Sequence, residues 1–174
     1  MRKIMLLLSL VLILPTISFA VDPFKIGCID LQKVLYESEA GKKAKSDIDA
    51  LIKSKQSALD EKRKVIEKLR GELEKQASVL SPEAKKSKQD ELEKMEREYL
   101  RVAQDSDTEV RKKDNELRDI ILKEILELVN KVGNEEGYTL IIERGTVLYL
   151  DKVIDITDEV IKKYNELKTK PKKQ

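Results

Sequence analysis

The sequence contains no histidine, no tryptophan and a single cysteine. Without histidine, the chain lacks the side chain that most often serves as a general base or a metal ligand. It also has no glycine-rich phosphate loop, no cysteine pair and no nucleophile motif, so we expect neither an enzyme nor a bound metal or cofactor. Cys28 cannot form an internal disulfide, and its position in an apolar run predicts a small buried side chain.

Aromatic residues make up only 4% of the 174 residues, whereas charged residues make up 39%. A chain of this length usually forms one compact domain, but so high a charged fraction leaves too few apolar residues for one core. The composition therefore predicts that most of the chain is solvent-exposed helix, or that other copies of the chain complete the core.

The first twenty residues have the pattern of a secretory signal peptide. Arg2 and Lys3 precede an apolar run, residues 4–14, and the small residues Ser18 and Ala20 lie at a cleavage site. The run is short for a membrane span. We therefore predict that residues 1–20 are removed on export. Subtracting Arg2 and Lys3 from 35 basic residues leaves 33, which balances the 33 acidic residues.

Residues 40–124 contain almost no glycine, proline or aromatic residue, and their apolar residues recur at helical spacing. One apolar series repeats every seven positions, at Ile52, Leu59, Ile66, Leu73 and Leu80. The companion series is half polar, at Ile48, Lys55, Lys62, Leu69 and Gln76. Because a coiled coil needs apolar residues in both series, we expect two helices that lie side by side without tight packing.

The segment Ser81-Pro82-Glu83 marks the turn between these helices. Serine can cap a helix, proline suits its first position, and glutamate complements the helix dipole. We predict that the first helix ends near Leu80, that the tip lies at residues 79–83, and that the second helix returns antiparallel. The spacing of the return helix changes phase between Tyr99 and Val110, and an apolar stripe resumes at Leu117, Ile121, Ile125, Leu128 and Val132.

Ion pairs within each helix help to explain how such exposed helices persist in water. An acidic residue that precedes a basic one by four positions adds about 0.2–0.5 kcal/mol of helix stability. Four such pairs are Asp60/Lys64, Glu93/Arg97, Asp107/Arg111 and Asp114/Arg118.

The two ends of the exported chain, residues 21–39 and 125–168, predict a small body. We expect strands at 24–29, 138–142 and 146–150, the last two joined in a hairpin at Arg144-Gly145. A short helix follows Asp30, where Gly41 either interrupts it or allows a close approach. Thr157 caps the last helix, and a basic tail occupies residues 169–174. The predicted fold class is α+β, with a long antiparallel helical hairpin projecting from a β-rich body.

This body is too small for a stable core, and its edge strands need cover. We therefore predict burial between subunits. The expected interface residues are Ile26, Cys28, Leu140, Ile142, Val147 and Tyr149.

The thin apolar stripe of the hairpin has two interpretations. The first is packing between the two helices, and the second is weak, adaptable contact with a binding partner along the margins. The candidate residues are Ile48, Ile52, Leu59, Ile66, Leu73, Leu80, Leu92, Met95, Tyr99 and Val102.

Basic residues outnumber acidic ones near the tip. They either provide solubility or attract acidic partners and anionic lipid head groups. Nucleic acid is not expected, because the tip lacks aromatic residues for base stacking. The basic residues are Lys62, Arg63, Lys64, Lys68, Arg70, Lys75, Lys85, Lys86 and Lys88.

Three segments, at residues 25–42, 136–149 and 155–161, together resemble the Skp/OmpH family of periplasmic chaperones. Residues 25–35, ending in Glu39-Ala40-Gly41-Lys42, resemble the family's N-terminal signature. Residues 136–149 resemble its C-terminal hairpin, and residues 155–161 resemble the start of its last helix. The resemblance implies a homotrimer in which strands of three subunits form a central barrel. It also implies that the three hairpins surround a cavity, where unfolded outer membrane proteins are held without ATP.

Two alternatives remain open from the residues themselves. A structural coiled-coil protein that spaces or tethers layers of the cell envelope would also be long and helical, although it would be expected to have denser apolar seams and to form rods. A protein that binds membrane surfaces through the basic tip is a third possibility, which is compatible with the chaperone.

Overall fold

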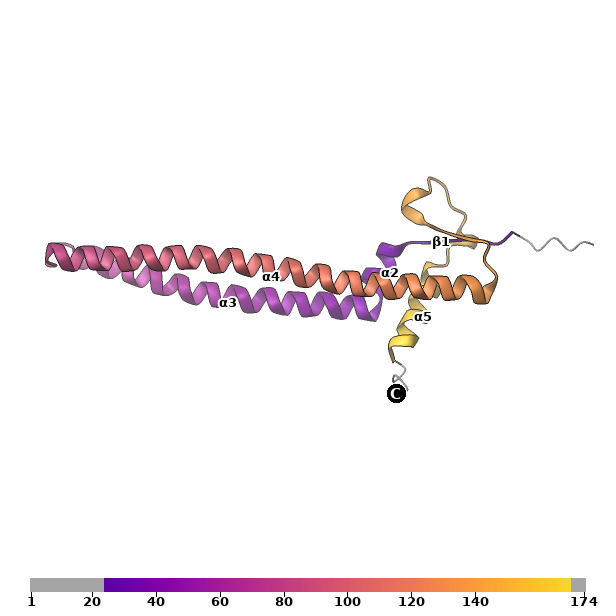
Figure 1. Ribbon diagram of the computed structural model, residues 1–174, viewed down its shortest axis with the longest axis horizontal. Coiled ribbons are helices and arrows are strands. Elements are labelled where there is room, and N and C mark those ends of the chain that lie inside the picture. Colours follow the sequence, from indigo (N-terminus) through magenta and orange to yellow (C-terminus); the bar gives the residue numbers. More distant parts are fainter. Residues whose placement is uncertain (1–23, 170–174) are drawn as a thin grey trace, which may run out of the picture.

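The structure, a computed structural model, describes residues 24–169 and shows a long helical hairpin that projects from a small body at one end (Figure 1). The predicted signal peptide and residues 170–174 of the basic tail lie outside the described residues. The elements in chain order are β1 (Ile26–Ile29), α2 (Leu31–Glu37), α3 (Glu39–Gln76), α4 (Pro82–Glu136), β2 (Leu140–Glu143), the 3-10 helices η1 (Arg144–Thr146) and η2 (Lys152–Ile154), and α5 (Thr157–Thr169).

The two helices of the hairpin differ in length. Helix α3 has 38 residues and α4 has 55, which correspond to about 57 Å and about 80 Å at the usual rise per residue. They run antiparallel, as predicted, and α4 continues past the start of α3 to cover the body (Figure 1). The hairpin is therefore attached to the body through the C-terminal part of α4.

The turn at the tip has the predicted cap but begins earlier than predicted. The Ser81 hydroxyl accepts a hydrogen bond from the Ala84 amide at 3.2 Å, and Pro82 occupies the first position of α4. Helix α3 ends at Gln76, four residues before Leu80. The chain turns there because the amides of both Val79 and Leu80 donate to the Gln76 carbonyl at 3.0 Å.

The break between α2 and α3 lies at Ser38 rather than at Gly41. The Ser38 amide donates to the Val34 carbonyl at the end of α2, and its hydroxyl accepts from the Gly41 amide at the start of α3. Gly41 provides the close approach that was the other prediction for this position. A Cβ atom at Gly41 would lie 1.7 Å from the Leu35 carbonyl oxygen, so only glycine allows α2 to fold back onto α3 here.

The body contains less β-structure than predicted. Strands β1 and β2 pair in parallel, with Ile26 opposite Leu140 and Ile29 opposite Glu143. The predicted hairpin at Arg144-Gly145 is wrong: the chain after β2 forms η1, and residues 147–150 form no strand. A strand needs a neighbour for its backbone groups, and this segment has none within one subunit. The whole of α2, α3 and α4 is therefore a crossover between two parallel strands.

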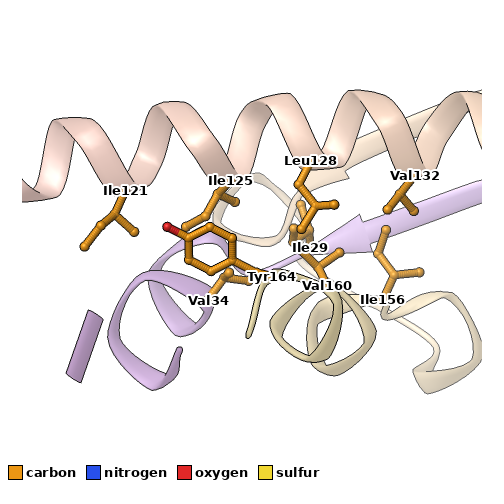
Figure 2. Close-up of a cluster of buried hydrophobic side chains, with 9 residues drawn as sticks. All are labelled: Ile29, Val34, Ile121, Ile125, Leu128, Val132, Ile156, Val160 and Tyr164. Carbon is orange, nitrogen blue, oxygen red and sulfur yellow. The ribbon is translucent and has the colours of Figure 1, made fainter. Parts of the chain in front are cut away.

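The core lies where the C-terminal part of α4 meets the body. Figure 2 shows side chains of α4 pointing onto Tyr164 and Val160 of α5 and onto side chains of β1 and α2. Ile125, Val34 and Val160 are fully buried. The cluster consists of Ile29, Val34, Ile121, Ile125, Leu128, Val132, Ile156, Val160 and Tyr164.

Thr157 has a different role from the predicted cap of α5. The Asp155 carboxylate accepts a hydrogen bond from the Thr157 amide at 3.0 Å, so it satisfies the first amide of α5 from two residues before the helix. The Thr157 hydroxyl instead accepts from the Asp30 amide at 2.9 Å. This bond joins the end of β1 to the start of α5, which positions α5 beneath α4.

Two glycines of α3 provide a matched test of the packing. Replacing Gly71 with alanine should raise the free energy of unfolding by about 0.5–1 kcal/mol, because no atom lies within 4 Å of the new Cβ and alanine favours a helix. Replacing Gly41 with alanine should lower it by about 1–3 kcal/mol or more, because the Cβ would clash with backbone. Urea unfolding measures both changes, and equal effects would contradict the assigned packing.

Candidate functional site

The hairpin has almost no buried residues except at its root, the end that is attached to the body. Within residues 42–120 of the structure, only Ile66 and Ser106 are buried, each with 8% of its surface exposed. One of these two is polar. The two helices therefore lie against each other along a thin seam of mostly half-buried residues, as the half-polar repeat predicted.

The structure places most of the predicted stripe along this seam. Ile66 is buried, and Ile52, with 47% of its surface exposed, lies outside the seam. Leu51 takes its place as the half-buried residue on that turn. The remaining eight stripe residues are half-buried: Ile48, Leu59, Leu73, Leu80, Leu92, Met95, Tyr99 and Val102.

Other apolar side chains of the hairpin are exposed singly. Their positions fall outside the seven-residue series, which is why the repeat did not identify them. They are Val65, Val79, Leu100 and Ile120. The hairpin thus offers many small apolar contacts rather than one continuous patch.

Ion pairs fill the polar positions of the seam. Lys55 donates to Glu109 at 2.6 Å, and Lys62 donates to Glu98 at 2.9 Å. The hydrogen bond from Lys62 holds the pKa of Glu98 below its ordinary value, because it favours the carboxylate form. Two further pairs join the helices nearer the tip, Arg70–Glu96 and Lys88–Glu72.

The basic tip is partly neutralised by its own acidic neighbours. Five of its nine predicted basic residues form ion pairs, either within α3 or between α3 and α4: Lys62, Arg63, Lys64, Arg70 and Lys88. The other four make no ion pair in the part of the chain that the structure describes: Lys68, Lys75, Lys85 and Lys86. The positive charge available to a partner is therefore smaller than the sequence count indicates.

The predicted interface residues of the body differ in exposure. Cys28 is fully buried, and burial raises the pKa of its thiol, so it remains a neutral, small apolar side chain. Ile26, Ile142 and Val147 are half-buried.

Leu140 and Tyr149 of the same prediction are exposed. Leu148 and Val153, which the prediction omitted, are also exposed on the segment that follows β2. In a strand over residues 146–150, the side chain of Leu148 would point to the face opposite that of Val147 and Tyr149. The interface prediction therefore left Leu148 out. In the irregular segment both Leu148 and Tyr149 face solvent.

No metal-binding arrangement is found in residues 24–169. No group of three or more cysteine, aspartate or glutamate residues there could hold a metal ion. Nor is any helix of the described chain long and apolar enough to cross a membrane.

A set of ion pairs fastens the root of the hairpin to the body. Lys163 of α5 forms ion pairs with Glu136 at the end of α4 and, at 2.9 Å, with Glu159. Lys25 donates to the Glu136 carbonyl at 2.9 Å. The hydrogen bond from Lys163 holds the pKa of Glu136 below its ordinary value. Nearby, the Tyr164 hydroxyl donates to Glu124 at 2.5 Å.

Comparison with known proteins identifies relatives over most of the chain. The family described as outer membrane protein (OmpH-like) matches residues 25–164. An uncharacterised protein of Aquifex aeolicus (strain VF5) is 30% identical over 166 residues, which cover 95% of this chain and 98% of the relative. The crystal structure of a candidate outer membrane chaperone (OmpH-like) from Caulobacter crescentus CB15 has a TM-score of 0.78 at 15% identity, over 82% of this chain and 84% of the other.

The ion pairs of Glu136 predict a loss of stability in acid. Since its pKa is lowered in the folded state, the stabilisation is present above about pH 4.5 and is lost as the pH falls through the lowered value. Replacing Glu136 with glutamine should cost about 0.2–1 kcal/mol at pH 7 and flatten the decline between about pH 5 and 3. Urea midpoints measure this, with the exposed Glu135→Gln as control. Identical acid profiles for the two variants would contradict the prediction.

Proposed function

We propose, from the fact that the chain belongs to the OmpH-like (Skp) family of outer membrane protein chaperones, that it is an ATP-independent holdase for unfolded outer membrane proteins. The family is periplasmic and is not a family of enzymes. In the proposed function, the hairpins of several subunits surround a client, the unfolded protein, and keep it from aggregating until it is delivered.

The observation that carries this proposal is the near absence of buried residues in the hairpin beyond its root. A hairpin that served only to support itself would bury more of its apolar side chains. Here the half-buried seam and the singly exposed Val65, Leu100 and Ile120 remain within reach of a partner. Such dispersed contacts support a binding surface that accepts many unfolded chains without fixing one shape.

The cavity requires more than one subunit, and we propose a homotrimer with a shared barrel. The segment 146–150 supports this arrangement, because it has the composition of a strand and has no neighbour within its own subunit. Leu148 and Tyr149 are exposed there, and Leu140 on β2 is exposed as well. Two adjacent, exposed apolar side chains such as Leu148 and Tyr149 are typical of a surface that another subunit covers.

Export supports the same function. Residues 1–20 are proposed to be a cleaved signal peptide, which would deliver the chain to the periplasm, where unfolded outer membrane proteins pass.

The tip of the hairpin supports a second contact, with the surface of an anionic membrane. Lys68, Lys75, Lys85 and Lys86 are not neutralised by an ion pair within the described chain, and Val79 between them is exposed. Lysines near a negatively charged leaflet are each attracted to it. The alternative of a structural spacer has less support, because Lys55 and Lys62 interrupt the seam that a rod-forming coiled coil would need.

The proposed function predicts that the purified protein, without residues 1–20 and without ATP, suppresses aggregation of a urea-denatured porin on dilution. Light scattering should fall close to baseline at about one assembled trimer per porin. A soluble protein of similar net charge is the control. Unchanged aggregation at a severalfold molar excess would rule out the holdase function.

The proposed assembly predicts that Leu148→Asp with Tyr149→Asp disrupts the oligomer. Two charges placed in a buried apolar contact would be desolvated without partners, so association should weaken at least tenfold. Sedimentation equilibrium measures the native mass, and Val79→Asp, an equally exposed apolar position at the tip, is the control. A monomeric parent protein, or a variant that keeps the parent mass, would contradict this assembly.

A further inference from the structure

The middle of the hairpin lies between two buried apolar side chains, one toward the tip and one toward the body. We call residues 55–62 of α3 and 98–109 of α4 the polar midsection. Its two inter-helix ion pairs lie at its ends, Lys55–Glu109 and Lys62–Glu98, and its one buried residue is Ser106. Ile66 is buried on the tip side of it and Ile121 on the body side. The polar midsection thus lies between two positions where the helices are joined by buried apolar side chains.

Ion pairs hold this segment weakly. The side chain of Lys55 is 30% exposed and that of Lys62 is 42% exposed, so water and salt reach both pairs. Exposed pairs add little stability, and the distance over which charges interact falls from about 10 Å at 0.1 M salt to about 3 Å at 1 M. The ion pairs of this segment are therefore weak, and their attraction depends on ionic strength.

Parting of the helices would uncover apolar side chains that the closed hairpin half buries. Leu59 of α3 and Tyr99 and Val102 of α4 are half-buried within the polar midsection. Leu100, on the same turn as Tyr99, is already exposed. Opening the seam would place Leu59, Tyr99 and Val102 within reach of one extended apolar segment.

We propose that the polar midsection is a latent binding site, in which α3 and α4 part and present Leu59, Tyr99 and Val102 to an apolar segment of an unfolded protein. The identity of this partner rests on the proposed function, whereas the opening itself does not. Higher ionic strength shifts the hairpin toward the open form by screening Lys55–Glu109 and Lys62–Glu98. At lower ionic strength the seam stays closed, and the apolar side chains stay half-buried.

A seam-closing variant tests this proposal against a matched control. Lys55→Leu with Lys62→Leu places apolar residues at both interrupted seam positions, which favours the paired helices. Lys53→Leu with Lys64→Leu makes the same change in charge and composition on α3. Lys53 and Lys64 are exposed, and Lys64 pairs with Glu61 of its own helix, so this control leaves the inter-helix pairs intact.

Hydrogen exchange of the full mature protein, without any client, measures the opening. Between about 0.05 M and 1 M sodium chloride, amides of the polar midsection should exchange several-fold faster in the parent protein and in the control variant, because helices that part lose mutual support. Amides of residues 121–132 in the core should change little. The seam-closing variant should exchange more slowly and show little response to salt. An equal response in all segments, or a seam-closing variant that responds like the control, would overturn the opening.

Client binding tests the second half of the proposal at one fixed salt concentration. The seam-closing variant should bind a urea-denatured porin several-fold more weakly than the control variant, as measured by fluorescence anisotropy of the labelled porin. Equal affinity of the two variants would overturn the role of the seam in binding. A parent protein that binds no porin would overturn this role together with the proposed function, while the exchange measurement would still decide the opening.

Discussion

The packing of Ile125 and Val132 of α4 against Val160 and Tyr164 of α5 brings together parts of the chain that are distant in sequence. Side chains of β1 and α2 complete the same cluster (Figure 2). Burial of each large apolar side chain contributes about 1.5–3 kcal/mol, so this cluster is the main source of stability in one subunit. It holds the C-terminal part of α4 firmly, and everything beyond it projects without support from the body.

That attachment explains how the hairpin can be both long and poorly packed. Because α4 is one continuous helix from the tip to the body, the hairpin keeps its direction even where its seam is polar. Intrahelical ion pairs stabilise the exposed surface, and three of the four predicted ones form, at Glu93–Arg97, Asp107–Arg111 and Asp114–Arg118. In the fourth, Lys64 pairs with Glu61 instead of Asp60. The apolar side chains of the seam are thereby left partly accessible, which is the property that the proposed function needs.

The candidate site could be read from the sequence only in part. A seven-residue repeat placed Leu59 and Leu73 on the seam, but Leu51 rather than Ile52 faces inward near the body. The repeat of a real helix pair drifts relative to a strict count of seven, so the register is set by which side chains meet across the seam. Nor could the count of basic residues at the tip indicate that Lys62, Arg70 and Lys88 are paired, since their partners lie on the facing helix.

The helices, their turn and the apolar stripe that forms the core follow from local preferences and periodicity, so they could be predicted from the residues. Ser81 and Pro82 cap a helix through their own chemistry, and the stripe from Ile121 to Val132 is apolar at helical spacing whatever it meets. Two features emerge only from the folded chain: β1 and β2 pair in parallel across the whole hairpin, and residues 147–150 form no strand within one subunit. The reason is that a strand is completed by backbone groups of another segment, and no local pattern specifies which segment that is.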